Sequence, residues 1–305
     1  MKHVKIIGKL FKETAKKWYA RDPFSESAVI AFNAIFSLPG LLVLVISLAG
    51  YFFGTEAVNG RLRSQVSEAM GTDTADQVQQ MVLMASRKKD SLWATILAIL
   101  TIIIGATAVF VEFQKVLNNI WEVKATTKKS GILAFLKTRL FSFGLIITIA
   151  FLLLISLVVS SLLSALSTWV LKHWSESLLV LFELLNFIIS IGIIMLLFSM
   201  MFKILPDAKI KWHSVWIGAF VTALLFVVGK TALGLYFGKA DPASGYGAAG
   251  SIILILLWTS YSSVIVLFGA EFTKVYSDHY YGSIPATENA VKQKTEVGEI
   301  IKTHI

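Results

Sequence analysis

Long apolar runs constrain the fold of this chain more than any other feature of its sequence. A membrane-crossing helix needs ~20 predominantly apolar residues. Six runs reach that length, at residues 28–53, 92–113, 141–168, 178–202, 215–237 and 250–272. The runs are continuous, whereas a membrane β-strand alternates apolar and polar residues over ~10 positions. We therefore predict an all-α, polytopic membrane protein with six transmembrane helices.

The composition points to the same class. Hydrophobic residues make up 56% of the 305 residues and charged residues 15%, against roughly 45–50% and ~25% in soluble proteins. The chain has no cysteine, which excludes disulfide bonds and cysteine metal sites. The first 20 residues lack the apolar core and the small-residue cleavage site of a signal peptide, so we expect no cleaved leader.

Positive charge predicts how these helices are oriented. Six spans place both termini on the same side of the membrane. Twenty of the 28 Lys and Arg residues fall in segments on that side, and seven fall on the other. Because cytoplasmic loops are rich in Lys and Arg, we place both termini in the cytoplasm. This predicts a cytoplasmic helix at 1–27, a membrane domain at 28–272 and a cytoplasmic polar tail at 273–305 that is mobile from about residue 281.

The N-terminal segment has the pattern of an amphipathic helix with a basic face and an apolar face. The basic face carries Lys2, Lys5, Lys9, Lys12 and Lys16, and the apolar face carries Val4, Ile7, Phe11 and Trp18. A basic helix with an apolar underside lies in the headgroup plane of an anionic leaflet. We therefore predict an interfacial helix, with the lipid bilayer and its anionic lipids at the cytoplasmic face as partners. A solvated helix is the alternative.

The segment at 54–91 falls on the outer side in this topology and has a helical pattern of its own. Two sets of apolar positions share one face each: Val58, Leu62 and Val66, then Val78, Met81, Val82 and Ala85. The residues "GTD" at 71–73 separate the sets, and Thr74 is of a type that caps helices. We predict two short helices that form a small outer loop.

Lys230 places a full charge inside the apolar run at 215–237, about 6 Å outward of its middle. Its helical neighbours Ala219, Ala223 and Gly234 are small, so we expect Lys230 to point into the protein. Glu183 and Asn186, three residues apart on the run at 178–202, lie at compatible depth. We predict a Glu183–Lys230 pair, and both a structural ion pair and a substrate or proton site remain open.

Further polar residues gather in the outer half of the predicted bundle. Ser156, Ser160 and Ser164 form one stripe along the run at 141–168, and "WTSYSS" at 258–263 adds Trp258 and Tyr261. Together with Lys230 and Glu183 they predict a polar cavity that opens outward. The alternative is that the serine hydroxyls bond to carbonyls of their own helix.

Three polar residues mark the inner half of the predicted bundle: Asn33, Glu112 and Glu271. The two glutamates share a phrase, "EFQKV" at 112–116 and "EFTKV" at 271–275, in which a Lys follows the Glu by three residues. This spacing predicts a local ion pair at each helix end. A degenerate parallel repeat is a second interpretation.

The motifs near the end of the chain resemble a known family. "GKTALGLYFG" at 229–238 and "YGAAGSIILILLWTSYSSVIVLFGAEFTKVY" at 246–276 are similar to the closing signature of the YihY / virulence factor BrkB family. The segment "SAVIAFNAIFSLPGLLVL" at 27–44 is similar to its first span, although "AFNAIFSLPG" departs from the commoner family pattern. The matching positions are Gly229, Lys230, Tyr236, Tyr246, Gly247, Gly250, Trp258, Gly269, Ala270 and Glu271.

The resemblance implies a multi-pass protein of the bacterial cytoplasmic (inner) membrane and leaves its chemistry open. Some members have been labelled ribonuclease BN, and others are linked to envelope integrity, serum resistance or lipid export. A metal-dependent ribonuclease needs clustered His and acidic ligands, and the five histidines of this chain show no ligand spacing. P-loop, GxSxG and HExxH motifs are absent. We expect no catalytic activity, no metal, no cofactor and no nucleic-acid partner.

Two function classes remain. A transporter or exporter would use Lys230 to bind an anionic envelope component, a lipid or a solute, in the outward-facing cavity. A non-catalytic scaffold or envelope assembly factor would use the same ion pair only to fasten its helices. An intramembrane enzyme acting on lipid is least favoured, because the catalytic motifs are missing.

Overall fold

The fold is mostly helical, as the apolar runs predict. The computed structural model describes residues 2–85, 92–126, 177–240, 242–288 and 290–293. Its helices are α1 (Lys2–Ala20), α2 (Pro23–Phe53), α3 (Thr55–Met70), α4 (Thr72–Ala85), α5 (Leu92–Ile120), α7 (Ser177–Ile204), α8 (Trp212–Ala240), the 3-10 helix η1 (Ser244–Ala249) and α9 (Gly250–Tyr281). Two short strands, β1 (Val123–Ala125) and β2 (Ala290–Lys292), are exceptions to the predicted all-α class.

Within the described ranges, four helical segments are long and apolar enough to cross a membrane: Pro23–Ser47, Phe187–Ile204, Trp212–Ala240 and Gly250–Tyr281. They correspond to the first, fourth, fifth and sixth predicted spans. The second predicted span, 92–113, falls within α5, and the third, 141–168, lies outside the described residues. The number of six spans therefore stays a prediction. Helix α9 continues past residue 272, where we expected the cytoplasmic tail to begin.

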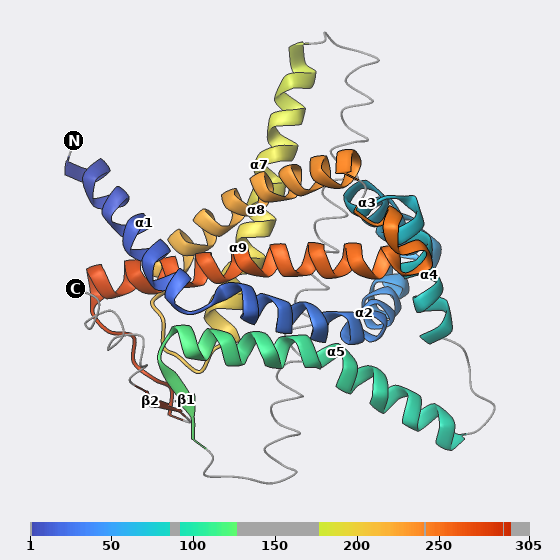
Figure 1. Ribbon diagram of the computed structural model, residues 1–305, viewed down its shortest axis with the longest axis horizontal. Coiled ribbons are helices and arrows are strands. Elements are labelled where there is room, and N and C mark those ends of the chain that lie inside the picture. Colours follow the sequence, from blue (N-terminus) through green and yellow to red (C-terminus); the bar gives the residue numbers. More distant parts are fainter. Residues whose placement is uncertain (1, 86–91, 127–176, 241, 289, 294–305) are drawn as a thin grey trace.

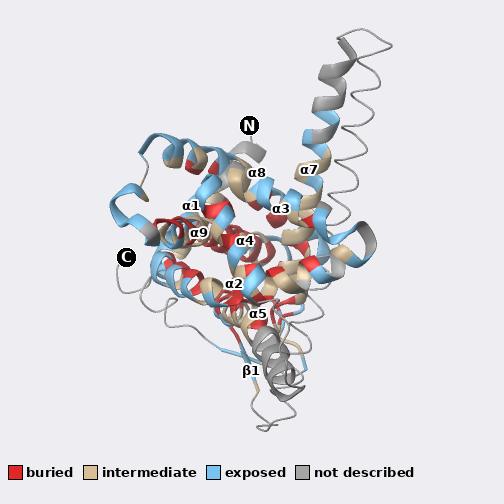
Figure 2. Cartoon of the chain, turned by 90° about the vertical axis from the view of Figure 1, so that its right-hand side faces the viewer, coloured by how far each residue is buried: buried red, intermediate tan, exposed pale blue. Residues whose placement is uncertain are grey.

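Helix α9 runs through the middle of the molecule, with α8 along one side and α2 and α5 along the other (Figure 1). Buried residues gather around it in Figure 2. The main core cluster draws its members from α2, α5, α7, α8 and α9, among them Ile30, Leu117, Phe202, Ala219 and Ala270. This main cluster therefore joins five helices, and two smaller core clusters lie apart from it.

Helices α8 and α9 approach closely through two reciprocal glycine–threonine contacts. A Cβ on Gly218 of α8 would overlap Thr273 Oγ1 of α9, and a Cβ on Gly269 of α9 would overlap Thr222 Oγ1 of α8. Each threonine hydroxyl donates to the carbonyl of the glycine four residues earlier in its own helix, at 2.7 Å for Thr222 and 2.8 Å for Thr273. Small residues at these positions let the two backbones approach closely.

Residues 55–85 form two helices, α3 and α4, whose apolar faces pack on the neighbouring ends of α2 and α9. One core cluster combines Val58 of α3 and Val78 of α4 with Ile46 of α2 and Ile255 of α9. Gly71, with a φ of 90°, separates α3 from α4. Thr74 does not cap α4 as we expected, because the helix begins at Thr72 and the Thr74 hydroxyl donates to Met70 O at 3.1 Å.

The segment after α9, where we expected a mobile tail, makes specific contacts as far as residue 293 where it is described. Strand β2 pairs with β1 in an antiparallel two-stranded sheet. Lys209 N donates to Pro285 O at 2.8 Å, and Gln293 N donates to Glu122 O at 2.8 Å. Ile284 is buried in the main core cluster. The segment therefore ties the α5–β1 end to the α7–α8 connection.

Candidate functional site

Lys230 lies on α8 and is exposed, whereas we expected it to point into the protein. The small residues Ala219 and Ala223 are fully buried, as expected for a packed face. Further along α8, however, the buried positions are Gly229 and Leu233. Successive residues on a helix differ by about 100° in direction. Burial of Gly229 against α9 therefore turns Lys230 away from that contact.

Tyr261, a second predicted residue of the outer site, lies beside this position. A Cβ on Gly229 would lie 3.1 Å from Tyr261 Cε1 and 3.4 Å from its hydroxyl oxygen. The structure thus brings Tyr261 of α9 next to the residue that precedes Lys230. Trp258 is half-buried one turn earlier on α9. Of the predicted outer site, these are the residues that the structure places.

The remaining residues of the predicted outer site cannot be positioned from the described side chains. Glu183 and Asn186 belong to α7, and their side chains are outside the description. Ser156, Ser160 and Ser164 fall in the undescribed range 127–176. The Glu183–Lys230 pair and the outward-facing cavity therefore stay predictions.

At the opposite end of the bundle, two of the three predicted inner residues make only local contacts. Asn33 Nδ2 donates to Val29 O of its own helix at 2.9 Å. Glu112 forms the predicted ion pair with Lys115, at 2.9 Å between Glu112 Oε1 and Lys115 Nζ. As hydrogen-bond acceptor and nearby negative charge, Glu112 raises the pKa of Lys115. Neither contact links distant elements.

Glu271 behaves differently, and its predicted pairing with Lys274 is wrong. The carboxylate lies 2.9 Å (Oε2) from Nε of Arg21, which sits in the turn between α1 and α2. Lys274 instead contacts Glu122 Oε1 at 3.0 Å and Asp278 Oδ2 at 3.4 Å. Lys274 lies on the same helix as Glu271, but its ammonium is drawn to carboxylates nearer the end of the bundle.

Arg21, Glu122, Glu271, Lys274 and Asp278 form one network, which we call the Arg21–Glu271 network. Arg21 Nη2 lies 3.5 Å from Glu122 Oε1, so Glu122 connects the two cations. The side chains of Arg21, Glu271 and Lys274 are 8%, 1% and 7% exposed. The network therefore joins the α1–α2 turn, the end of α5 and α9. The Arg21–Glu271 pair is largely removed from water, where the interaction is stronger than in solvent.

Two residues in or next to this network have unusual backbone conformations. Asp22 and Glu122 have φ values of 49° and 56°, which non-glycine residues seldom adopt. Asp22 caps α2 by accepting a hydrogen bond from Ser25 N at 3.4 Å, and Pro23 follows in the first helical turn. The sequence "RDP" at 21–23 is therefore a helix-start signal that fixes the direction of Arg21. Arg21 and Glu122 were not among our predicted site residues, and this signal could have indicated Arg21.

A small cavity adjoins the network, lined by Trp18, Arg21, Glu26, Asn119 and Glu271 among others. The centre of a water molecule can occupy ≈ 10 Å³ within this cavity, which is room for about one water. Trp18 Nε1 and Glu271 Oε1 are buried without a hydrogen-bond partner in the part of the chain that the structure describes. A single water in this cavity would accept a hydrogen bond from Trp18 Nε1 and donate one to Glu271 Oε1.

Comparison with known proteins places the chain among membrane proteins. The family model described as "Virulence factor BrkB" matches residues 14–294. A protein named "UPF0761 membrane protein" from Tolumonas auensis is 29% identical over 61% of this chain and 58% of its own length. Proteins of the same name from Saccharophagus degradans and Pseudoalteromonas atlantica are each 24% identical, over 90% and 84% of this chain and 61% and 82% of their own lengths.

The chain thus spans about three fifths of the length of the first two relatives. No solved structure matches it significantly. The family match covers nearly all of the chain, including both the Arg21–Glu271 network and Lys230. The chain therefore belongs to the virulence factor BrkB family and is a membrane protein.

Proposed function

We propose that this protein transports or exports an anionic envelope component across the bacterial cytoplasmic (inner) membrane, with both termini in the cytoplasm. The observation that carries the proposal is the exposed side chain of Lys230 on α8, a helix long and apolar enough to cross a membrane. A Lys near the centre of a membrane helix costs ~2.5–3.5 kcal/mol on insertion scales. A phosphate or carboxylate of a cargo molecule offsets this cost by charge pairing.

The surroundings of Lys230 favour an amphiphilic cargo over a small hydrophilic one. Val228 and Leu235 of α8 are exposed apolar residues, and Tyr236 is half exposed. Tyr261 contributes a phenol beside Gly229. A surface that combines one cation, phenol groups and aliphatic side chains suits a molecule with an anionic headgroup and a hydrocarbon tail. We therefore infer that an anionic lipid is the preferred cargo, with an anionic solute as the alternative.

Transport needs no catalytic residues, and we propose a non-catalytic protein. In the described ranges, no three His, Asp or Glu side chains gather closely enough to hold a metal ion. The relatives are named only as membrane proteins. These observations give no support to the ribonuclease label.

Reconstitution into liposomes tests the transport proposal. We expect Lys230→Met to slow the movement of a labelled anionic phospholipid between leaflets at least tenfold, and Lys230→Arg to retain most of the rate because it keeps the charge. Lys239→Met, which removes an exposed charge at the end of the same helix, is the matched control and should retain the wild-type rate. A Lys230→Met rate equal to wild type would contradict the proposal.

The packing of α8 against α9 favours a second function, that of a non-catalytic scaffold or envelope assembly factor. The reciprocal contacts of Gly218 with Thr273 and of Gly269 with Thr222 hold these helices in one close arrangement. A scaffold predicts no lipid movement by the wild-type protein, together with loss of envelope integrity in cells when these contacts are broken. Wild-type transport above that of protein-free liposomes would exclude a purely scaffolding role.

A further inference from the structure

Helix α1 packs against α9. Leu10 is buried in a cluster with Phe272 and Val275 of α9, and Ile217 and Val221 of α8 pack against the same cluster. The ring of Phe11 lies 4.9 Å from that of Phe272 and 6.2 Å from that of Phe268. The buried side of α1 therefore packs on protein. Ile7, which we had assigned to the apolar face, is instead 53% exposed.

The contacts of α1 also give its depth along the bundle. Ile217 follows the first residue of α8, Trp212, by five positions, and Phe272 precedes the last residue of α9, Tyr281, by nine. At 1.5 Å per residue, α1 contacts α9 ~14 Å inside its end, and the α8 residue nearest the same cluster lies ~8 Å inside the end of α8. A helix at that distance lies against the lateral wall of the bundle and does not cap its end.

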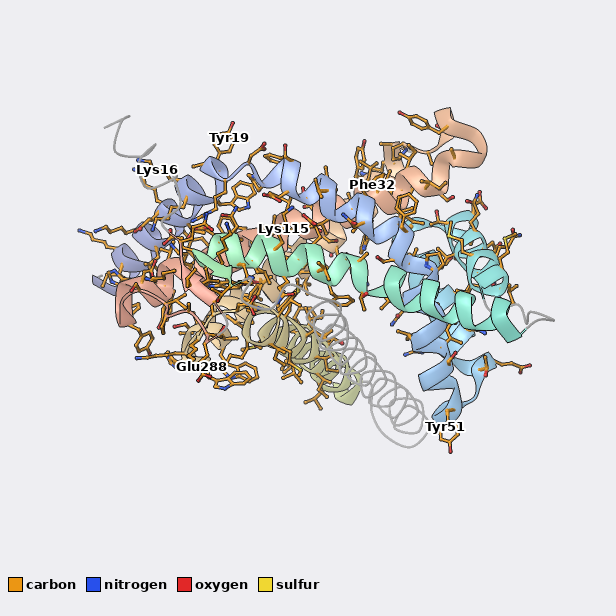
Figure 3. The ribbon with its side chains drawn as sticks, turned by 90° about the horizontal axis from the view of Figure 1, so that it is seen from below. Lys16, Tyr19, Phe32, Tyr51, Lys115 and Glu288 are labelled. Atoms are coloured by element: carbon orange, nitrogen blue, oxygen red, sulfur yellow. The ribbon has the colours of Figure 1, made fainter. Side chains whose placement is uncertain are left out.

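The opposite face of α1 carries concentrated positive charge. Its exposed lysines follow one another at intervals of three or four residues: Lys5, Lys9, Lys12 and Lys16. Figure 3 shows Lys16 and Tyr19 directed away from the helical bundle. The single acidic residue of α1, Glu13, is paired with Lys17 at 2.9 Å. Nothing else on this helix offsets the four lysines, which we call the α1 lysine face.

Exposed aromatic residues at the same end of the bundle mark a membrane interface. Tyr19 of α1 is 72% exposed, and Trp212 at the start of α8 is 50% exposed. Trp216 and Tyr280 are also exposed. Trp and Tyr are enriched at headgroup level because their rings have both apolar and polar parts. The α1 lysine face is therefore placed where lipid phosphates lie.

We propose that the α1 lysine face binds the phosphate headgroups of anionic phospholipids in the leaflet that surrounds this end of the protein. Attraction to an anionic membrane surface contributes roughly fivefold in association per Lys near that surface. Because α1 is fixed against α9, the four lysines are held together on one side of the protein. The surface is separate from Lys230, so its existence does not depend on the transport proposal.

Lipid selectivity of the whole protein tests this inference. The full chain is reconstituted in phosphatidylcholine vesicles, and its association with spin-labelled phosphatidylglycerol is compared with that of spin-labelled phosphatidylcholine. We expect wild type to prefer phosphatidylglycerol severalfold, and the preference to fall at high salt because surface charges are screened. The quadruple variant Lys5→Gln, Lys9→Gln, Lys12→Gln and Lys16→Gln should lose most of the preference. Gln has a helix propensity close to that of Lys, so α1 should remain folded.

A second quadruple variant controls for net charge. It removes four exposed cations that lie outside α1: Arg61→Gln, Lys124→Gln, Lys239→Gln and Lys292→Gln. We expect it to keep most of the wild-type preference. Equal losses in the two quadruple variants would overturn the proposal, since net charge alone would then explain selectivity. The proposal would also be overturned if wild type showed no preference for phosphatidylglycerol, or if a short RNA displaced the spin-labelled lipid from the protein.

Discussion

Lys230 and Glu271 are both charged residues within helices that are apolar enough to cross a membrane, yet the structure surrounds them differently. Glu271 is fully buried, lies 2.9 Å from Arg21 and belongs to a network that joins three parts of the chain. Lys230 is exposed between apolar neighbours on α8. A buried charge with a fixed partner serves to position helices, whereas an exposed charge in an apolar helix can meet a ligand. This difference supports a structural role for the Arg21–Glu271 network and motivates our proposal that Lys230 meets a cargo.

The largest effect on stability is expected at the network. Glu271→Ala leaves Arg21 buried without its main partner, and breaking a buried pair in this way costs ~3–5 kcal/mol. Arg21→Ala should have a similar effect, and the double variant should cost less than the sum of the two. The free energy of unfolding in lipid–detergent micelles measures both. Glu112→Ala is the control, because it removes the carboxylate of a pair with an exposed lysine, Lys115. If it lowers the free energy of unfolding as much as Glu271→Ala does, the network has no special role in stability.

The next effect is expected between α8 and α9. A Cβ at Gly269 would overlap Thr222 Oγ1, so Gly269→Ala should destabilise the protein by ~1–3 kcal/mol, as overpacking does. Gly234→Ala is the matched control, because a Cβ there meets no atom within 4 Å. In a helix, that change alone should be neutral or stabilising by up to ~1 kcal/mol. If thermal unfolding shows both variants to be alike, the close contact does not contribute to stability.

The smallest effect is expected at Lys115. Its pKa is raised by the hydrogen bond to Glu112 and by the charge of that residue. Because this pKa is raised in the folded state, the Lys115–Glu112 pair contributes its full stabilisation of the fold below the usual Lys pKa. That stabilisation is lost as the pH rises through the raised pKa. Exposed pairs of this kind contribute ~0.2–1 kcal/mol. Lys115→Met should therefore lower stability slightly at pH 7 and leave it unchanged relative to wild type at pH above that range, as measured by chemical unfolding.

The sequence predicts local features of this fold more successfully than contacts between distant segments. Apolar runs and helical spacing locate α2, α8 and α9 and the Glu112–Lys115 pair, because these depend on residues close in sequence. Arg21 and Glu271 are 250 positions apart, so no periodicity connects them. Spacing within α8 likewise does not reveal that Gly229 packs against Ile265 and Tyr261 of α9 while Lys230 is exposed.

The residues that carry the family resemblance acquire physical roles once the structure is known. Gly247 has a φ of 50°, a conformation that favours glycine. Gly269 allows the close approach of Thr222, and Glu271 pairs with Arg21. These positions are explained by backbone conformation and packing. Lys230 is exposed on α8, and its assignment to cargo remains our proposal.

Determining the structure of the protein in nanodiscs that contain an anionic phospholipid tests the role of Lys230 most directly. We predict density for a lipid headgroup within hydrogen-bond distance of Lys230 Nζ, about 3 Å, in wild type and its absence in Lys230→Met. The contrary result is Lys230 engaged only by a carboxylate of the chain, such as Glu183, with no lipid beside it. Lys230 would then be a structural ion-pair residue like Arg21, and the contrast between the two regions would be lost.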